Sequence, residues 1–244
     1  MIPIEHTDKK ELFRIINQYN LNIDTIYDCG SRDALDGIEL FQKLNAKEIH
    51  IFECNPPSVQ VCNNNLYAQL GKDQNNLVWF LNDFAIADHL GEIEFRPINT
   101  DRTITPHKGG NPGASSIFLA SDKYTKETYV QNLIKVPVKT LNNYTENRKK
   151  PDLLWMDLQG AELLALKGSS KILDHVKIIH LEVSFREMYK GQCLYFELDN
   201  FLKKENFKQI SIDIGNWPKW FFLYKIFKTG PWLGNAIYIN KRYI

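Results

Sequence analysis

The chain alternates short apolar runs with amphipathic stretches. The apolar runs have the length of buried strands and lie at residues 23–27, 49–52, 77–81, 153–156 and 176–183. Between them, apolar residues recur at helical spacing in residues 37–44, 57–70, 161–167 and 193–205. Strands that alternate with helices predict an α/β fold, in which a mostly parallel, Rossmann-like sheet carries helices on both faces.

The two ends of the chain extend this pattern. Apolar residues at helical spacing after Thr7 and Asp8, either of which can cap a helix, predict a lead-in helix within residues 1–22. Residues 207–214 and 235–240 read as the last two strands, which we expect to pair antiparallel. No repeat or linker interrupts the pattern, so we expect a single domain over residues 1–244.

The middle of the chain is less regular. Residues 91–97 and 133–138 alternate apolar and polar positions like half-exposed strands, and Pro137 favours a sheet edge for the second. Between them, residues 99–116 form a long loop rich in Gly, Pro and Thr. A loop of this length within a compact domain is usually disordered or a functional lid.

The stretch from residue 153 to 168 carries the strongest candidate for chemistry. Its strand stops at Asp157, Gln159 and Gly160 form a turn, and a short helix runs to Gly168. An isolated acid here could simply cap that helix. However, earlier predicted strands also end in acidic residues, at Asp28, Glu53 and Asp83. Parallel strands present their carboxyl ends at one edge, where ligands of open α/β sheets bind, so this row of acids indicates a site.

The loops after the first three strands favour a nucleoside ligand. Gly30 would let the backbone approach a ligand closely, but no GxGxxG follows it, so a pyrophosphate cradle is not indicated. Glu53 could accept hydrogen bonds from both ribose hydroxyls, while Asp83 and Phe84 offer an acceptor for an exocyclic amine and an apolar face for a purine. S-adenosylmethionine fits this set. The predicted cofactor residues are Asp28, Gly30, Ser31, Arg32, Glu53, Asn55, Asp83, Phe84 and Asp157.

Composition limits the other interpretations. The net charge of +1, from 30 basic and 29 acidic residues, gives no electrostatic reason to expect nucleic acid as a partner. The cysteines at 29, 54, 62 and 193 have neither CxxC nor zinc-site spacing and are typical of buried thiols in a reducing compartment. The amino-terminal residues lack the apolar segment of a secretory signal, and no run is long enough for a transmembrane helix. We therefore expect a cytoplasmic protein.

Several segments resemble the FkbM-type S-adenosylmethionine-dependent methyltransferases. They are DCGSRD, FECNP, NDFAIAD, GASS, VPVKTLNNY and MDLQGAELLALKG, and the most specific part is the DxQGxE pattern at Asp157, Gln159, Gly160 and Glu162. The resemblance implies a class I methyltransferase fold, a seven-stranded sheet with an antiparallel last strand, and methylation of a hydroxyl, mostly on glycan sugars or polyketide products. Family members commonly have Ala-Asn-x-Gly where this chain has residues 31–34, so we expect Arg32 to hold the methionine carboxylate or the substrate.

Methyl transfer to a hydroxyl needs a general base, because the hydroxyl loses its proton as the new bond forms. In the class I strand order that the resemblance implies, the strands that carry Asp157 and Glu182 are neighbours, so the two acids should lie close together at the sheet edge. Two close carboxylates either share a proton, which makes one of them the base, or hold a divalent metal, which is not required here. Glu162 is either a third catalytic group or the residue that fixes the Gly160 turn. His180 shares the strand face of Glu182, where a packed core histidine is the commoner role.

We expect the acceptor between residues 113–116 and 188–191. Ser115, Ser116 and Tyr189 are candidate substrate residues, and His107 is either a base carried by the loop or a solvated histidine. Residues 215–234 form an aromatic insertion that could be a lid, a dimer surface or, with its lysines, a peripheral membrane contact. Its aromatic and basic members are Trp217, Lys219, Trp220, Phe221, Phe222, Lys225, Lys228 and Trp232.

The sequence leaves other functions open. The acceptor hydroxyl could belong to a natural product that is not a sugar. A nicotinamide-dependent oxidoreductase or epimerase shares the fold class, although the missing glycine fingerprint argues against it. A methyltransferase-like binding module without catalysis is the third alternative, against which the acids at the strand ends speak. The oligomeric state is not predicted.

Overall fold

A computed structural model of the protein describes residues 7–71, 78–215 and 231–244. Seven strands form one sheet in the order β3 (Val78–Asn82), β2 (Glu48–Phe52), β1 (Thr25–Cys29), β7 (Leu153–Met156), β8 (Ile178–Ser184), β10 (Leu233–Asn240) and β9 (Phe207–Asp213). The strand β10 is antiparallel to both of its neighbours, whereas the pairs from β3 to β8 are parallel. The predicted sheet and its antiparallel last strand are confirmed.

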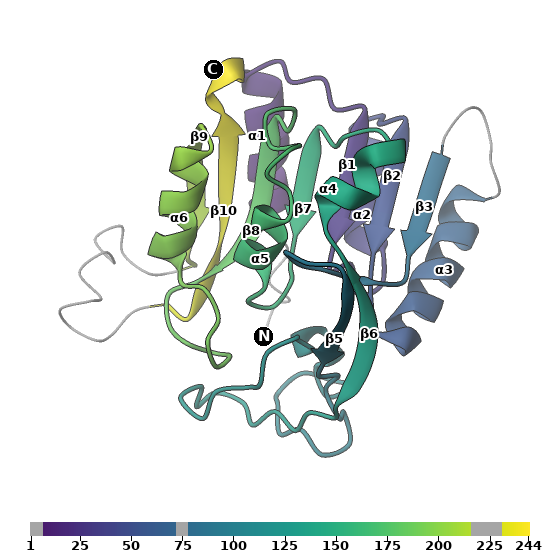
Figure 1. Ribbon diagram of the computed structural model, residues 1–244, viewed down its shortest axis with the longest axis vertical. Coiled ribbons are helices and arrows are strands. Elements are labelled where there is room, and N and C mark those ends of the chain that lie inside the picture. Colours follow the sequence, from purple (N-terminus) through teal and green to yellow (C-terminus); the bar gives the residue numbers. More distant parts are fainter. Residues whose placement is uncertain (1–6, 72–77, 216–230) are drawn as a thin grey trace.

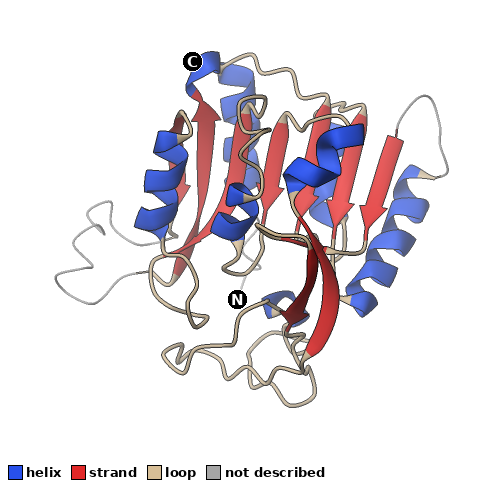
Figure 2. Cartoon of the chain, viewed as in Figure 1, coloured by secondary structure: helices blue, strands red, loops and turns tan. Residues whose placement is uncertain are grey.

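Helices cover both faces of this sheet (Figures 1 and 2). One face carries α1 (Thr7–Gln18), α2 (Leu35–Lys43) and α3 (Pro56–Leu70), and the other carries α4 (Leu141–Tyr144), α5 (Glu162–Lys167) and α6 (Tyr195–Lys204). Every residue of β1, β2 and β7 is buried because both faces are covered. This burial is the reason that these strands read as continuous apolar runs in the sequence.

A second, three-stranded sheet lies beyond the carboxyl ends of the parallel strands (Figure 1). Its order is β4 (Ala85–Ile86), β6 (Ile134–Lys139) and β5 (Gly91–Phe95), so β6 is the central strand and the expected edge position of Pro137 is wrong. Pro137 lies opposite Glu92 of β5, but no residue of β4 lies opposite it, because β4 pairs with Val138 and Lys139 alone.

The long loop between β5 and β6 folds back on itself. Isolated β-bridges join Arg96 to Ser116, Ile98 to Gln131 and Ile104 to Thr128. A fourth bridge, from Ala120 to Tyr189, ties the loop to the segment after β8. The loop therefore forms a wall over the carboxyl edge of the main sheet. The remaining short helices are η1 (Pro112–Ala114), η2 (Thr145–Asn147) and η4 (Lys241–Tyr243).

One strand boundary differs from the sequence prediction in a way that concerns the site. The strand β1 starts at Thr25 and runs to Cys29, so Asp28 lies inside the strand rather than at its end. Most of the expected aromatic insertion, residues 216–230, lies outside the described residues. Over the described ranges, the four cysteines are free thiols, and none of the helices has the length and apolar character needed to cross a membrane.

Candidate functional site

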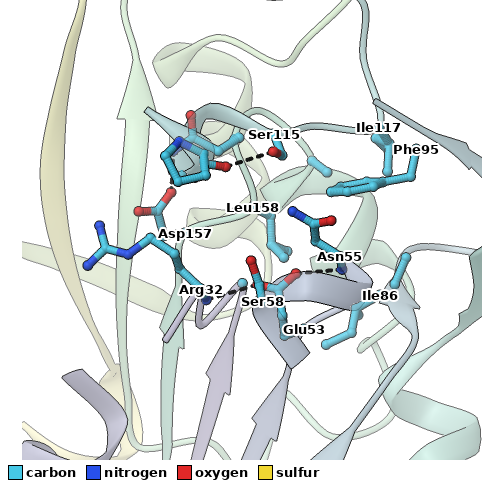
Figure 3. Close-up of a pocket in the computed structure, with 16 residues that line it drawn as sticks. Arg32, Glu53, Asn55, Ser58, Ile86, Phe95, Ser115, Ile117, Asp157 and Leu158 are labelled. Carbon is cyan, nitrogen blue, oxygen red and sulfur yellow. Dashed lines mark hydrogen bonds between the residues drawn. The ribbon is translucent and has the colours of Figure 1, made fainter. Parts of the chain in front are cut away.

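Two neighbouring cavities lie at the carboxyl edge of the main sheet. The first is built from the loops after β1, β2 and β7 and is closed by apolar side chains of the small sheet and the long loop (Figure 3). Its polar lining includes Arg32, Glu53, Asn55, Ser58, Ser115 and Asp157, and its apolar lining includes Ile86, Phe95, Ile117 and Leu158.

Gly30 brings the β1 loop against the end of β7. Its φ of +85° is a left-handed conformation, and a Cβ atom at this position would lie 1.9 Å from the carbonyl oxygen of Asp157. The chain therefore needs glycine here for both reasons. The backbone of this loop forms part of the cavity surface, as the sequence predicted for a close ligand contact.

Glu53 is held in place by the backbone around it. Its carboxylate accepts hydrogen bonds from the N–H groups of Arg32 at 2.9 Å and Asn55 at 2.7 Å. Burial raises the pKa of the Glu53 carboxyl, and these two hydrogen bonds oppose the shift. Asn55 also lines the cavity, and its buried Oδ1 has no hydrogen-bond partner among the described residues. The cavity thus offers acceptors to a ligand with hydroxyl or amine donors.

Four expected cofactor residues lie outside this cavity lining. Ser31 donates its hydroxyl to Asp28, whose carboxyl is buried, and burial raises the Asp28 pKa to about 7. Phe84 packs on Phe52 in the core at 5.8 Å between ring centroids, so it is not a free purine face, while Asp83 is exposed. The apolar wall comes instead from the side chains of Ile86, Phe95 and Ile117.

The second cavity has a volume of about 240 Å³ and shares Arg32, Gly113, Asp157 and Gln159 with the first. Glu182 faces it from β8, and His107 and Glu127 face it from the long loop. Because Asp157 and Gln159 line both cavities, they lie where a ligand in one would meet a ligand in the other.

The structure brings Asp157 and Glu182 together through Gln159. The side-chain nitrogen of Gln159 lies 2.6 Å from Asp157 Oδ1 and 3.3 Å from Glu182 Oε2. Burial raises the pKa of both carboxyls, and the charge of Asp157 raises that of Glu182 further. The side-chain NH₂ group of Gln159 thus bridges the two acids. Within the described part of the chain, no group of three or more His, Cys, Asp or Glu could hold a metal, so the metal alternative gains no support.

Glu162 lies behind the turn rather than in a cavity. Its Oε1 accepts the N–H groups of Leu158 at 2.8 Å and Gly160 at 3.3 Å, and the side chain is buried. Burial, and then the charge of Asp157, raises the Glu162 pKa to about 7. Of its two expected roles, this geometry favours fixing the Gly160 turn over direct catalysis.

The expected substrate residues divide into two groups. Ser115 lines the first cavity and His107 the second, where its Nε2 lies 3.8 Å from Glu127. Ser116 and Tyr189 are buried and line neither. Ser116 donates to the carbonyl of Gln159 at 2.8 Å, and the Tyr189 hydroxyl lies 2.8 Å from both the Ala114 carbonyl and Gln159 Oε1. Both therefore support the wall instead of facing a substrate.

His180 stacks on Trp155 at 3.7 Å between ring centroids and is buried, in agreement with the packed role.

Sequence reasoning missed the polar centre of the long loop. The side chain of Glu127 is buried against the second cavity. It accepts hydrogen bonds from Thr105, Asn111, Tyr124 and Tyr129. Burial works against its charge, but these bonds lower the Glu127 pKa. The segment YTKETY, with one acid between two tyrosines, was the available signal.

The aromatic side chains that line the second cavity also come from the long loop. Tyr124 and Tyr129 line it, and Tyr124 packs edge-on against Trp232 at 5.0 Å between ring centroids. Trp232 is thus the described member of the aromatic group that the sequence analysis singled out. Trp217, Trp220, Phe221 and Phe222 lie outside the described residues.

Comparisons with known proteins agree with the fold. The chain is 27% identical over 171 residues to the 2-O-methyltransferase NoeI of Sinorhizobium fredii, which covers 68% of this chain and 66% of that protein. Its fold is similar to that of a methyltransferase FkbM from Methylobacillus flagellatus, with a TM-score of 0.53, 12% identity, and coverage of 89% of this chain and 44% of that one.

A magnesium protoporphyrin IX methyltransferase from Synechocystis, solved with bound S-adenosylmethionine, has the same fold at a TM-score of 0.51 and 9% identity, with 96% of this chain and 78% of that one covered. The chain thus spans less than two thirds of the length of NoeI and of the Methylobacillus protein. Residues 28–208 match the family described as the methyltransferase FkbM domain. The chain therefore belongs to the FkbM methyltransferase family.

Proposed function

We propose that this protein is an S-adenosylmethionine-dependent O-methyltransferase that methylates a hydroxyl of a sugar in a glycan or glycoconjugate. The observation that carries the proposal is the pair of cavities with Asp157 in their common wall. A methyl donor and an acceptor need adjoining sites, with a proton acceptor where they meet. The two cavities and Asp157 supply this arrangement.

The first cavity suits the cofactor. Glu53 and Asn55 would accept hydrogen bonds from the ribose hydroxyls, Ile86 and Phe95 offer the adenine an apolar wall, and Arg32 would pair with the methionine carboxylate. When bound, S-adenosylmethionine supplies a methyl group on a positively charged sulfur. The methyltransferase family of the chain supports this choice of cofactor.

The second cavity suits a hydroxylated acceptor. Asp157 and Glu182 are in position to take the proton of an acceptor hydroxyl, and the remaining polar lining can hold further hydroxyl groups. Tyr124 and Tyr129 give the aromatic surface on which a sugar ring can pack. NoeI is a 2-O-methyltransferase, and its similarity to this chain supports oxygen as the methylated atom.

A hydroxyl on a natural product that is not a sugar is the second candidate, because the same lining accepts any neutral polyol of similar size. Membership of a methyltransferase family argues against the alternative of a nicotinamide-dependent oxidoreductase or epimerase. A binding module without catalysis would need neither of the two acids at the junction of the cavities.

The proposal is tested in two steps. Isothermal titration with S-adenosylmethionine, S-adenosylhomocysteine and NAD should show binding of the first two and none of NAD. Transfer of labelled methyl groups to extracted glycans, with mass spectrometry of the products, should then show a gain of one methyl on a sugar. Labelling confined to non-sugar extracts would favour the second candidate, and cofactor binding without transfer to either would favour the binding module.

A further inference from the structure

Gln159 lies at the centre of the site in a conformation that few residues adopt. Its φ of +50° is left-handed, a conformation that is unfavourable for a residue with a side chain. Glycine or asparagine would take this position more easily. Strain of this kind persists where surrounding contacts impose it, and the Ser116 hydroxyl on the Gln159 carbonyl is one such contact.

The side chain of Gln159 uses both ends of its amide. The nitrogen must face Asp157 and Glu182, because a carbonyl oxygen turned toward two carboxylates would find no donor. The oxygen then faces the Tyr189 hydroxyl at 2.8 Å. This hydroxyl lies as close to the Ala114 carbonyl, and it favours this orientation of the amide when its single proton points to Gln159. Tyr189 is itself buried and stacks on Tyr129 at 6.4 Å between ring centroids.

Each N–H of the amide can therefore serve one carboxylate. Without these donors, two close carboxylates repel each other, and the pair reduces its charge by turning apart or by taking up a proton. Arg32 also lies at this junction, where its charge favours the ionised form of Asp157, but its Nε and Nη2 donate their hydrogen bonds to Asp33. Gln159 is thus the group that lets both acids face the junction of the cavities.

We propose that Gln159 is the positioning residue of the methyl-transfer site, where its amide holds Asp157 and Glu182 side by side and directs the negative charge that the pair carries at the junction of the two cavities. This inference rests on the proposed function, because the charge is useful where a cationic donor meets a hydroxyl. It assigns a task to the Gln of the DxQGxE pattern that neither carboxylate can perform itself.

The test compares two ligands that differ in one charge. S-adenosylmethionine carries a positive sulfur and S-adenosylhomocysteine a neutral one, so the ratio of their dissociation constants reports the negative charge at the junction. In Gln159→Met, which keeps the length of the side chain but removes the amide, titration calorimetry should show about tenfold weaker binding of S-adenosylmethionine, while binding of S-adenosylhomocysteine stays the same.

Gln159→Asn is the decisive second variant. Asparagine tolerates the left-handed conformation better than glutamine, so the fold is not at risk, but its amide is one methylene too short to reach both acids. It should shift the ratio as Gln159→Met does. Tyr189→Phe, which removes the hydroxyl that orients the amide, should shift it less in the same direction.

Gln42→Met is the matched control, since it makes the same substitution at an exposed position of α2 that lines neither cavity. It should leave both dissociation constants, and therefore their ratio, unchanged. Wild-type ratios in both Gln159 variants would overturn the positioning role while leaving the proposed function intact. A wild-type protein that binds neither ligand would overturn the proposed function, and this inference with it.

Discussion

At the scale of single residues, the acids near the turn at Gln159 divide into those that face a cavity and one that supports the backbone. Asp157 and Glu182 face the second cavity, whereas Glu162 accepts hydrogen bonds from two backbone N–H groups. The raised pKa of each comes first from burial, so the pKa shifts alone do not tell these roles apart. What separates them is the group that each carboxylate contacts.

The first prediction concerns the two acids that face the cavity. Asp157→Asn and Glu182→Gln keep the shape of each side chain but remove its capacity to take a proton. If one of them is the general base, at least one variant should lose about 10²-fold or more in turnover, measured with labelled S-adenosylmethionine and a competent acceptor. Near-normal turnover in both variants would exclude either acid as the base.

The second prediction concerns Glu162 and the pH dependence of stability. Its folded-state pKa of about 7 lies above the ordinary 4.5, so the folded protein binds this proton more tightly than the unfolded chain. The resulting stabilisation is complete below about pH 4.5 and is lost as pH rises through 7. Over this window the loss is at most about 3 kcal/mol, since one pKa unit corresponds to about 1.4 kcal/mol.

Glu162→Gln tests this directly, because its amide oxygen can accept the same two N–H groups at any pH. Denaturant unfolding between pH 5 and 8 should show a shallower decline of the unfolding free energy in the variant than in the wild type. Asp28, whose pKa is also raised to about 7, changes stability in the same direction in both proteins and cancels in the comparison. Identical pH profiles would contradict the expectation.

At the scale of elements, the site depends on how tightly the ends of β1 and β7 approach. Gly30→Ala would place a Cβ atom 1.9 Å from the Asp157 carbonyl at a left-handed φ of +85°. We expect a loss of about 3 kcal/mol or more in the free energy of unfolding, because both strain and overlap must be relieved. Gly109→Ala is the control, since its φ is +77° but nothing lies within 4 Å. It should cost about 1 kcal/mol. Equal losses would show that the close approach is unimportant.

Uniform burial makes a strand visible in the sequence, but it does not fix where the strand begins and ends. The pattern located β7 at its observed bounds because both faces of that strand are covered. It placed the first strand two residues too early, since Ile23 is buried without belonging to β1 and Asp28 is a buried acid within it. An acid after an apolar run therefore does not always mark the end of a strand, and the sequence alone does not show which of these acids reach a cavity.

The same limit applies to the site. Glu53, Asp157 and Glu182 were predicted to face a ligand because strand ends meet at one edge, and the structure brings all three to the cavities. Phe84 was expected there too, but an aromatic residue after a strand can equally turn into the core. Glu127 could not be placed, because its partners Thr105 and Asn111 come together only once the long loop has folded.

At the scale of the whole molecule, the first cavity joins the main sheet to the small one. Glu53 and Asp157 come from the edge of the main sheet, Phe95 from β5, and Ile117 from the long loop. A ligand that contacts all of them binds the folded state and not the unfolded chain, so it must stabilise the molecule by mass action. It should also link the motions of the two sheets.

This linkage gives the last prediction. S-adenosylhomocysteine at a hundred times its dissociation constant should stabilise the protein by about 2.7 kcal/mol, which for a domain of this size corresponds to a rise in melting temperature of about 5 to 10 °C. Hydrogen exchange should slow in residues 91–117 as well as in the β1 and β2 loops. In Glu53→Ala, which lacks the carboxylate that we propose as the acceptor for the ribose, the same ligand concentration should give a smaller rise. Slower hydrogen exchange in the main-sheet loops alone would mean that the ligand does not join the two sheets. An equal rise in melting temperature with NAD would contradict a nucleoside site that is specific to a methyl donor.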